Sequence, residues 1–216
     1  MKTQREQWVR AIKRERVSAI IRTKDQTLAA EAMQAAVDGG FKMIEFTLTT
    51  PGALELVNSF SKRDGLLVGA GTVLTTSQAR EAVAAGARFL VSPIIDAEVI
   101  GEAAALDVPC IPGAYTPTEM ETAHRYGADF IKVFPAPFGG AEFIRAVLGP
   151  LPHLNLFPTA GATPDNFGEF LEAGCAGVGF VRSLFVPSDL STGDFAAIRD
   201  RAARIVKRLS QYQARV

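Results

Sequence analysis

The feature of this sequence that most limits its fold is a rhythm, in which a short apolar run and then a helical stretch recur along the whole chain. Eight runs are typical of buried strands: SAIIR (18–22), MIEFTL (43–48), LLVGAGT (66–72), FLVSP (89–93), VPCIPG (108–113), FIKVFP (130–135), NLFPTAG (155–161) and GVGFVRSL (177–184). The stretches between them, such as DQTLAAEAMQAAVDGG and TTSQAREAVAAGA, begin with Asp, Ser or Thr and are rich in alanine. Many end at glycine, as helices do.

This alternation predicts an α/β fold with parallel strands. Eight units most simply close into a single-domain (β/α)8 TIM barrel over residues 1–216, with an N-terminal helix before the first strand. Glycine stops lead directly into strands in DGGFKMIE, AAGARFLV, RYGADFIK and EAGCAGVG. The alternative is a doubly wound open sheet, but no GxGxxG turn follows the first run. GAGTVL lacks the third glycine and belongs to the third run.

Composition excludes some partners. Lys plus Arg equals Asp plus Glu at 23 each, so the zero net charge gives no reason to expect nucleic acid or an acidic membrane as partner. No apolar run approaches the roughly 20 residues of a membrane span, and the basic start lacks a secretory apolar stretch. That start predicts an amphipathic helix with Trp8, Val9 and Ile12 on one side.

Cys110 and Cys175 have no metal-binding spacing and predict small buried residues in a reducing compartment, the cytoplasm.

A lysine stands inside the sixth run, FIKVFP, where residues alternate between the two faces of a strand. Lys132 shares its face with Phe130 and Phe134. Burying an ammonium group is costly unless its charge is paired or lost. A lysine on an edge strand would avoid that cost by facing water, but a closed barrel has no edge. The barrel therefore places Lys132 inside, pointing toward the carboxyl ends of the strands, where active sites of barrels lie.

The second run, MIEFTL, contains a glutamate. Its apolar residues would face the helices, which turns Glu45 and Thr47 into the barrel. A lone buried glutamate is expensive unless it has a partner or a task, and Lys132 is the obvious partner. A purely structural ion pair is the alternative. We give it less weight, because buried pairs stabilise weakly and barrels usually fill their interior with branched apolar residues.

Together these two residue types indicate nucleophilic catalysis by an amine. A lysine ordinarily has a pKa near ~10.4, and an apolar surrounding lowers that pKa by disfavouring the charged form. The neutral amine of Lys132 can attack a ketone and form a Schiff base, and the protonated imine then draws electrons from a neighbouring C–C bond. Glu45, as a carboxyl group with a raised pKa, is the candidate for moving the protons.

Other chemistries have less support. His124 in a helical stretch and His153 in a Pro-rich loop are typical of surface residues. No His/Asp/Glu cluster suggests a metal, no cofactor motif is present, and no GxSxG elbow suggests a hydrolase. Ser92 is better interpreted as a pocket wall than as a nucleophile without a base. Arg22, at the end of the first run, either binds a substrate carboxylate or is a surface residue.

Several segments together resemble a known family. IEFTL, GAGTVL, VSP, IPGAYTPTE, FIKVFPA and VGFVRSLFVP resemble, in the same order, segments of the bacterial 2-keto-3-deoxy-6-phosphogluconate and 4-hydroxy-2-oxoglutarate aldolases. The likeness runs from about Ala11 to Pro187. GAGTVL and the lysine–x–phenylalanine–proline motif are specific in combination. AIIRTKD and FLEAGCAGVG are especially similar to the galactonate branch of that family.

The resemblance implies a (β/α)8 barrel, usually a homotrimer, and a metal-independent class I aldolase that releases pyruvate and an aldehyde. It implies that Lys132 is the Schiff-base lysine and Glu45 the general acid and base. It also implies that Thr72, Pro93 and Phe134 wall the pyruvate pocket. The chemistry of Thr72 fits a carboxylate donor as well, because its hydroxyl lies at a strand end among glycines.

This chain departs from the family pattern in places. Thr49 stands where many members have an arginine that holds the pyruvate carboxylate, so that task would fall to Arg22. The glycine-rich phosphate cradle of the family, typically TGGI and VGxGS at the last two strand ends, is also altered. Here these segments are Thr159-Ala160-Gly161-Ala162 and Gly179-Phe180-Val181-Arg182-Ser183.

The changes in the cradle bear on the substrate. Gly161 and Ser183 remain candidates for contacts with it, whereas a Cβ placed where backbone N–H groups should face phosphate would block close approach. Arg182 either binds a phosphate or carboxylate instead, or points to water.

The sequence therefore predicts a class I, Schiff-base lyase. Its substrate would be a 2-keto-3-deoxy sugar acid of the 6-phosphogluconate type, or 4-hydroxy-2-oxoglutarate. Because the altered cradle disfavours a phosphorylated substrate, the second hypothesis is an oxaloacetate decarboxylase that uses the same lysine imine. A keto-acid-binding sensor on an inactive barrel is the non-enzyme alternative.

Overall fold

The structure is a computed structural model that describes residues 3–213. Each of the eight predicted runs overlaps a strand, and the fifth overlaps two short ones. The strands are β1 (Val17–Ile21), β2 (Met43–Thr47), β3 (Leu67–Gly71), β4 (Phe89–Val91), β5 (Cys110–Ile111), β6 (Gly113–Ala114), β7 (Ile131–Val133), β8 (Leu156–Pro158) and β9 (Val178–Phe180). The helices are α1 (Gln4–Glu15), α2 (Gln26–Asp38), α3 (Ala53–Ser61), α4 (Thr76–Ala84), α5 (Ala97–Ala105), α6 (Pro117–Arg125), α7 (Gly140–Leu148), α8 (Phe167–Glu172), α9 (Pro187–Thr192) and α10 (Phe195–Gln213).

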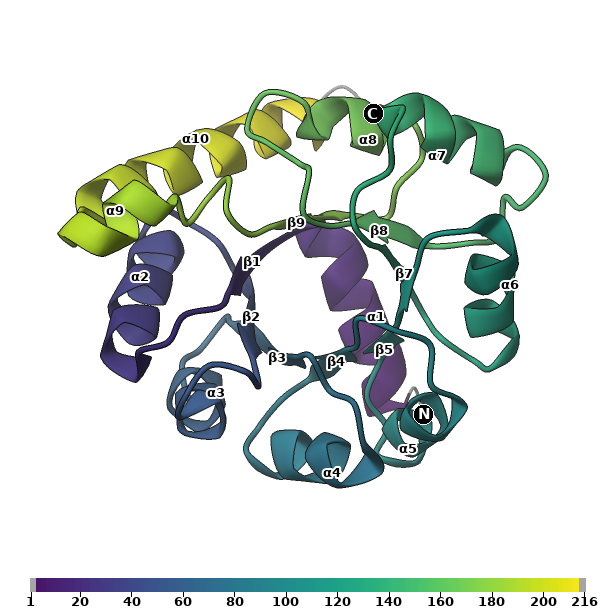
Figure 1. The fold of residues 1–216 in the computed structure, drawn as a ribbon, viewed down its shortest axis with the longest axis horizontal. Helices are drawn as coiled ribbons and strands as arrows, with labels where there is room; N and C mark the ends of the chain where they lie inside the picture. Colours follow the sequence, from purple (N-terminus) through teal and green to yellow (C-terminus); the bar gives the residue numbers. More distant parts are fainter. Residues whose placement is uncertain (1–2, 214–216) are drawn as a thin grey trace.

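The strands form two parallel sheets, in the orders β5-β4-β3-β2-β1-β9 and β6-β7-β8. One parallel bridge joins Thr159, just after β8, to Gly179 of β9. Pro112 alone separates β5 from β6. The sheets curl around a shared interior, and most of the helices cover their outside (Figure 1). The prediction of an α/β fold with parallel strands is confirmed.

The residues predicted to begin and end the helices do so in the structure. The Asp25 side chain caps α2 by accepting a hydrogen bond from Leu28 N over 2.7 Å, and Thr75 caps α4 in the same way. Such a cap contributes about 1 kcal/mol. At the other end, one glycine in each of the four near-repeats has a positive φ, a conformation that is strained for other residues. These glycines are Gly40, Gly86, Gly127 and Gly174.

Alternation along the strands separates two cores. On β2 and β7 the outward residues Ile44 and Val133 join the large core beneath the helices. The inward residues Met43 and Phe130 join a smaller core inside the curled sheets. Helix α1 packs Ile12 against this inner core, together with Trp8 and Val9, and it crosses behind the strands in Figure 1. The predicted amphipathic N-terminal helix is confirmed, and it covers the end of the interior where the strands begin.

The cysteines are small buried residues, as predicted. Cys110 and Cys175 are free thiols, and burial raises the pKa of each to about 12, which disfavours the reactive thiolate form.

Within residues 3–213 we find no helix that combines the length and the apolar character needed to span a bilayer.

Candidate active site

Lys132 is the middle residue of β7, and its side chain points into the interior. The strand is held between β6 and β8, with Lys132 in register with Gly113 and Phe157. The side chain is 7% exposed, and Nζ lies 4.8 Å from the centre of the Phe134 ring. An amine is therefore held among apolar groups near the carboxyl end of a strand, as the alternation predicts.

Glu45 points into the same interior from β2. It is 2% exposed and lines a small cavity together with Lys132. Its Oε1 atom is buried without a hydrogen-bond partner among the residues that the structure describes. A purely structural ion pair would engage the carboxylate fully, because an unpaired buried charge is costly. An unpartnered oxygen therefore favours the alternative that Glu45 has a task.

The surroundings of both groups favour their neutral forms. Burial raises the pKa of Glu45, and the positive charges of Lys132 and Arg22 oppose that effect. Burial lowers the pKa of Lys132; the charge of Glu45 opposes the change, and that of Arg22 adds to it. The shift in each pKa therefore favours a neutral amine near a carboxyl group that can both give and take a proton.

Arg22 and Thr72 meet at the mouth of this interior, although they follow different strands. Arg22 Nη2 donates to Thr72 Oγ1 over 3.2 Å. Thr72 follows β3 with φ 59°, a left-handed conformation that costs a non-glycine residue about 1–2 kcal/mol. Strain of this kind concentrates at functional sites. Together, the exposed guanidinium and the hydroxyl form a pair of donors suited to a carboxylate.

Pro93 and Phe134 line one hollow beside Lys132. It has a volume of about 340 Å³, and its other walls come from the loop after β4, from β6 and the residue after it, and from α6. Gly113, the register partner of Lys132, also lines it. The structure thus brings together two of the three residues that the resemblance assigns to the pyruvate pocket.

Thr47 is buried at the end of β2 and faces a loop of the same chain segment. Its Oγ1 lies 3.1 Å from Thr49 Oγ1 and 3.3 Å from Thr50 Oγ1. Thr50 Oγ1 in turn accepts a hydrogen bond from Thr23 N. The hydroxyl of Thr47 therefore helps to fix the loops after β1 and β2.

The ends of β8 and β9 are tied together. Ser183 Oγ donates to Ala162 O over 2.6 Å. Gly161 is exposed and lies against Ala136, so that a Cβ on Gly161 would overlap the Ala136 methyl group. Arg182 is exposed.

One expectation about the cradle needs correction. Ala162 is 2% exposed and belongs to the large core, so its methyl group does not reach the surface where a phosphate would approach. Ala160 is exposed with φ 63°, at a position where the resemblance implies glycine, and Val181 is half-buried. Of the four departures, Ala160, Val181 and Arg182 are the ones that are at least partly exposed.

Sequence reasoning missed two inward polar residues, Ser18 of β1 and Thr159 after β8. Both are 1% exposed and line the small cavity with Glu45 and Lys132. The signal was present, because alternation from Phe157 turns Thr159 inward.

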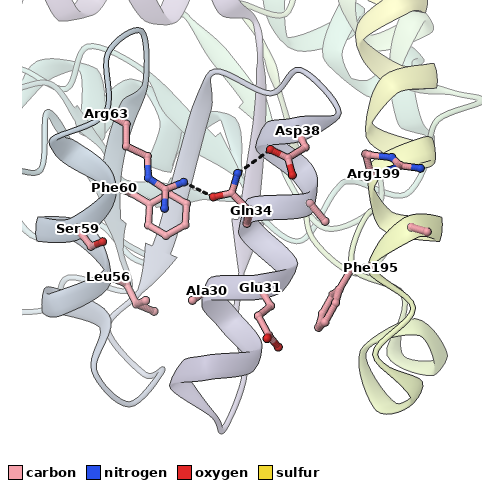
Figure 2. A pocket seen from close by; sticks show the side chains of 12 residues that line it. Ala30, Glu31, Gln34, Asp38, Leu56, Ser59, Phe60, Arg63, Phe195 and Arg199 are labelled. Carbon is pink, nitrogen blue, oxygen red and sulfur yellow. Dashed lines mark hydrogen bonds between the residues drawn. The ribbon is translucent and has the colours of Figure 1, made fainter.

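A larger hollow of about 530 Å³ lies elsewhere, on the outer layer among α2, α3 and the start of α10 (Figure 2). There Arg63 lies over the Phe60 ring and binds Gln34, which in turn donates to Asp38 over 2.6 Å. These are exposed surface contacts, without the buried ionisable groups that mark reactive sites. The outer hollow is larger, but the interior holds the buried ionisable groups, and it is therefore the candidate active site.

A buried amine near a buried carboxyl group, at the end of curled parallel strands, is the arrangement expected of an enzyme that works through a covalent lysine adduct. The family model described as "KDPG and KHG aldolase" matches residues 9–201. The chain belongs to this family.

Relatives and solved structures agree with that assignment. The 2-dehydro-3-deoxy-6-phosphogalactonate aldolase of Escherichia coli K12 is 35% identical over 77% of this chain and 83% of its own. The KHG/KDPG aldolase of the same organism is 33% identical over 88% and 91%. A structure described as native KDPGal aligns with a TM-score of 0.81 at 30% identity, over 92% of this chain and 96% of its own. The KDPG aldolase from Legionella pneumophila, with pyruvate captured as a covalent carbinolamine, aligns with a TM-score of 0.81 at 28% identity over 92% and 97%.

Proposed function

We propose that this protein is a class I lyase that cleaves a 2-keto-3-deoxy sugar acid, or 4-hydroxy-2-oxoglutarate, to pyruvate and an aldehyde. The observation that carries the proposal is the Lys132 side chain, buried inside the sheets with a lowered pKa. Membership of the KDPG and KHG aldolase family supports it. It also disfavours the sensor hypothesis, since the relatives named above are called aldolases.

In the proposed reaction, neutral Lys132 Nζ attacks the C2 ketone to form a carbinolamine. Loss of water, with a proton from Glu45, leaves a protonated imine. Glu45 then takes the proton of the C4 hydroxyl group, the C3–C4 bond breaks, and its electron pair moves toward the imine nitrogen. The aldehyde departs and leaves an enamine. Glu45 returns the proton to C3, and water releases pyruvate and the free amine.

The proposed pyruvate pocket surrounds this amine. Arg22 and Thr72 would bind the carboxylate, and their mutual hydrogen bond supports a shared role. Pro93 and Phe134 would wall the methyl side, because they line the hollow beside Lys132. We place Thr47 among the residues that shape the pocket, through its contacts with Thr49 and Thr50.

The rest of the substrate would extend toward the ends of β8 and β9. Gly161 and Ser183 lie there, and exposed Arg182 offers a positive charge to a phosphate or carboxylate. The 6-phosphogalactonate relative makes its named substrate class one candidate for this chain.

We infer that the curled sheets close as one (β/α)8 barrel and that residues 1–216 form a single domain. The bridge between Thr159 and Gly179 supports closure on one side, and the single residue between β5 and β6 supports it on the other. The large core supports one domain, since its residues come from both sheets and from the helices around them.

We also propose a cytoplasmic homotrimer. Three exposed apolar residues follow β3, β4 and β7, where the strands end: Leu74, Ile94 and Phe138, the last 94% exposed. Exposed apolar groups that gather at one end of a fold are typical of protein–protein contacts. Sedimentation equilibrium should give three chain masses, and a single chain mass would contradict this state. The buried free thiols support a reducing compartment.

The substrate is tested by measuring pyruvate release side by side. We compare 2-keto-3-deoxy-6-phosphogluconate, its galactonate isomer, 4-hydroxy-2-oxoglutarate and oxaloacetate. The imine also withdraws electrons when oxaloacetate loses CO₂, a step that needs no phosphate site. Because Ala160, Val181 and Arg182 alter the cradle, we expect the smaller substrates to be used at least as well as the phosphorylated ones. Ala160→Gly should raise kcat/KM for the phosphorylated substrates and leave it unchanged for oxaloacetate.

One outcome contradicts this interpretation of the cradle. If kcat/KM for a phosphorylated substrate is the highest by orders of magnitude, the chain with Ala160, Val181 and Arg182 still forms a working phosphate site. The lyase assignment itself would survive that result. If oxaloacetate is the best substrate, decarboxylation replaces aldol cleavage as the main activity.

A further inference from the structure

Strand β3 ends in a glycine that lies directly against the Glu45 carboxyl group. Gly71 is in register with Thr47 on β2, and Leu48 N donates to Gly71 O over 2.8 Å. A Cβ built on Gly71 would overlap Glu45 Oε1 and lie 2.7 Å from Cδ and 3.0 Å from Cγ. The carboxyl group thus occupies the space that a side chain at position 71 would fill.

Position 71 requires glycine because a side chain there would overlap Glu45, and not because of its backbone conformation. Gly71 is absent from the residues with positive φ, so its backbone suits alanine. Parallel pairing with β2 and β4 holds β3 on both sides. Glu45, by contrast, ends in a flexible carboxyl group, and within residues 3–213 its Oε1 has no hydrogen-bond partner to retain it. A methyl group at position 71 would therefore displace the carboxyl group rather than the strand.

We propose that Gly71 is a positioning residue, whose missing side chain allows the Glu45 carboxyl group to lie across the end of β3 and act on the substrate at Lys132. The next residue, Thr72, receives the hydrogen bond of Arg22. The end of β3 thus fixes the positions of both the proton carrier, Glu45, and the carboxylate donors, Arg22 and Thr72. This inference rests on the proposed role of Glu45 as the group that moves protons.

The test is a double-mutant cycle of Gly71→Ala and Glu45→Ala, with pyruvate release from 4-hydroxy-2-oxoglutarate as the readout. A misplaced catalytic group can cost about 10²-fold, so Gly71→Ala should lower kcat on that scale. KM and the final yield of pyruvate–borohydride adduct should stay close to those of the parent, because Lys132 is untouched. In the Glu45→Ala background, adding Gly71→Ala should change kcat by less than about twofold, since no carboxyl group remains to be displaced.

Gly69→Ala is the matched control, on the same strand and the same face. Its Cβ would overlap the Phe89 ring and lie 2.6 Å from Cδ2. We expect a lower unfolding temperature and an effect on kcat that is the same with or without Glu45. Should Gly71→Ala also lower the unfolding temperature, adding Glu45→Ala must restore it, because the same clash is removed.

Two results would overturn the inference: parent-like kcat in Gly71→Ala, or an equal loss in both backgrounds. If the proposed lyase function itself is wrong, the experiment gives different results. In that case the parent forms no adduct with pyruvate, or Glu45→Ala alone retains the parent rate.

Discussion

We expect the parent protein to form a covalent adduct with pyruvate that borohydride traps, and we expect the replacement of Lys132 with alanine to abolish it. Borohydride reduces an imine to a stable secondary amine, so only a lysine that forms the Schiff base retains the label. Lys132 is the buried lysine of the site, and its lowered pKa supplies the neutral amine that attack on a ketone requires. Mass spectrometry of the intact protein and of its peptides measures the adduct. Turnover should fall to background in the same variant.

The control is Lys42→Ala, which removes an exposed lysine immediately before β2. This variant should carry the label as the parent does. A label that persists in Lys132→Ala, or that maps to another lysine, would reject the assignment. A second variant, Lys132→Met, keeps the interior filled and guards against loss of fold.

The direction of the Lys132 pKa shift also sets how activity depends on pH. Burial lowers this pKa, so the reactive neutral amine accumulates at a lower pH than in an ordinary lysine. As pH increases, kcat/KM should rise through the lowered pKa and level off below pH ~10.4, the ordinary value. A rise that continues to that pH would show that the site does not perturb the lysine.

Glu45→Gln is expected to lower kcat by ~10²-fold or more, the usual scale for losing a general acid and base. Gln keeps the shape of the side chain but cannot give or take the proton. The fold and the binding of pyruvate should remain, because Glu45 Oε1 has no hydrogen-bond partner to lose among the described residues. Steady-state kinetics with 4-hydroxy-2-oxoglutarate and the final yield of pyruvate–borohydride adduct measure the two effects separately.

Stability provides a second readout for Glu45. Burial raises its pKa in the folded protein above the unfolded value. A group of this kind stabilises the fold fully below the unfolded pKa, and the contribution is lost as pH rises through the folded pKa. Gln avoids that loss, so the variant should unfold at the same or a higher temperature at neutral pH. Glu31→Gln, at an exposed position of α2, is the control for both measurements. An unchanged rate in Glu45→Gln would return Glu45 to a structural role.

Local sequence patterns determined much of this protein. Period-two alternation placed Lys132 and Glu45 inward and their apolar neighbours under the helices, because a strand turns successive side chains to opposite faces. Cap residues such as Thr75 and glycine stops such as Gly86 set where helices begin and end. These signals act over a few residues, so they can be recognised without knowledge of the rest of the chain.

Only the tertiary structure decided how distant strand ends combine. The hydrogen bond from Arg22 to Thr72 spans 50 positions, and no local pattern distinguishes a surface arginine from one that reaches across the mouth of a site. Ala162 was misjudged because a methyl group after a strand can face the core or the surface, and packing settles which. The space at Gly71 is likewise defined by the Glu45 carboxyl group of the neighbouring strand. In each case the deciding contact joins segments far apart in the chain, and it exists only once parallel strands are paired in register.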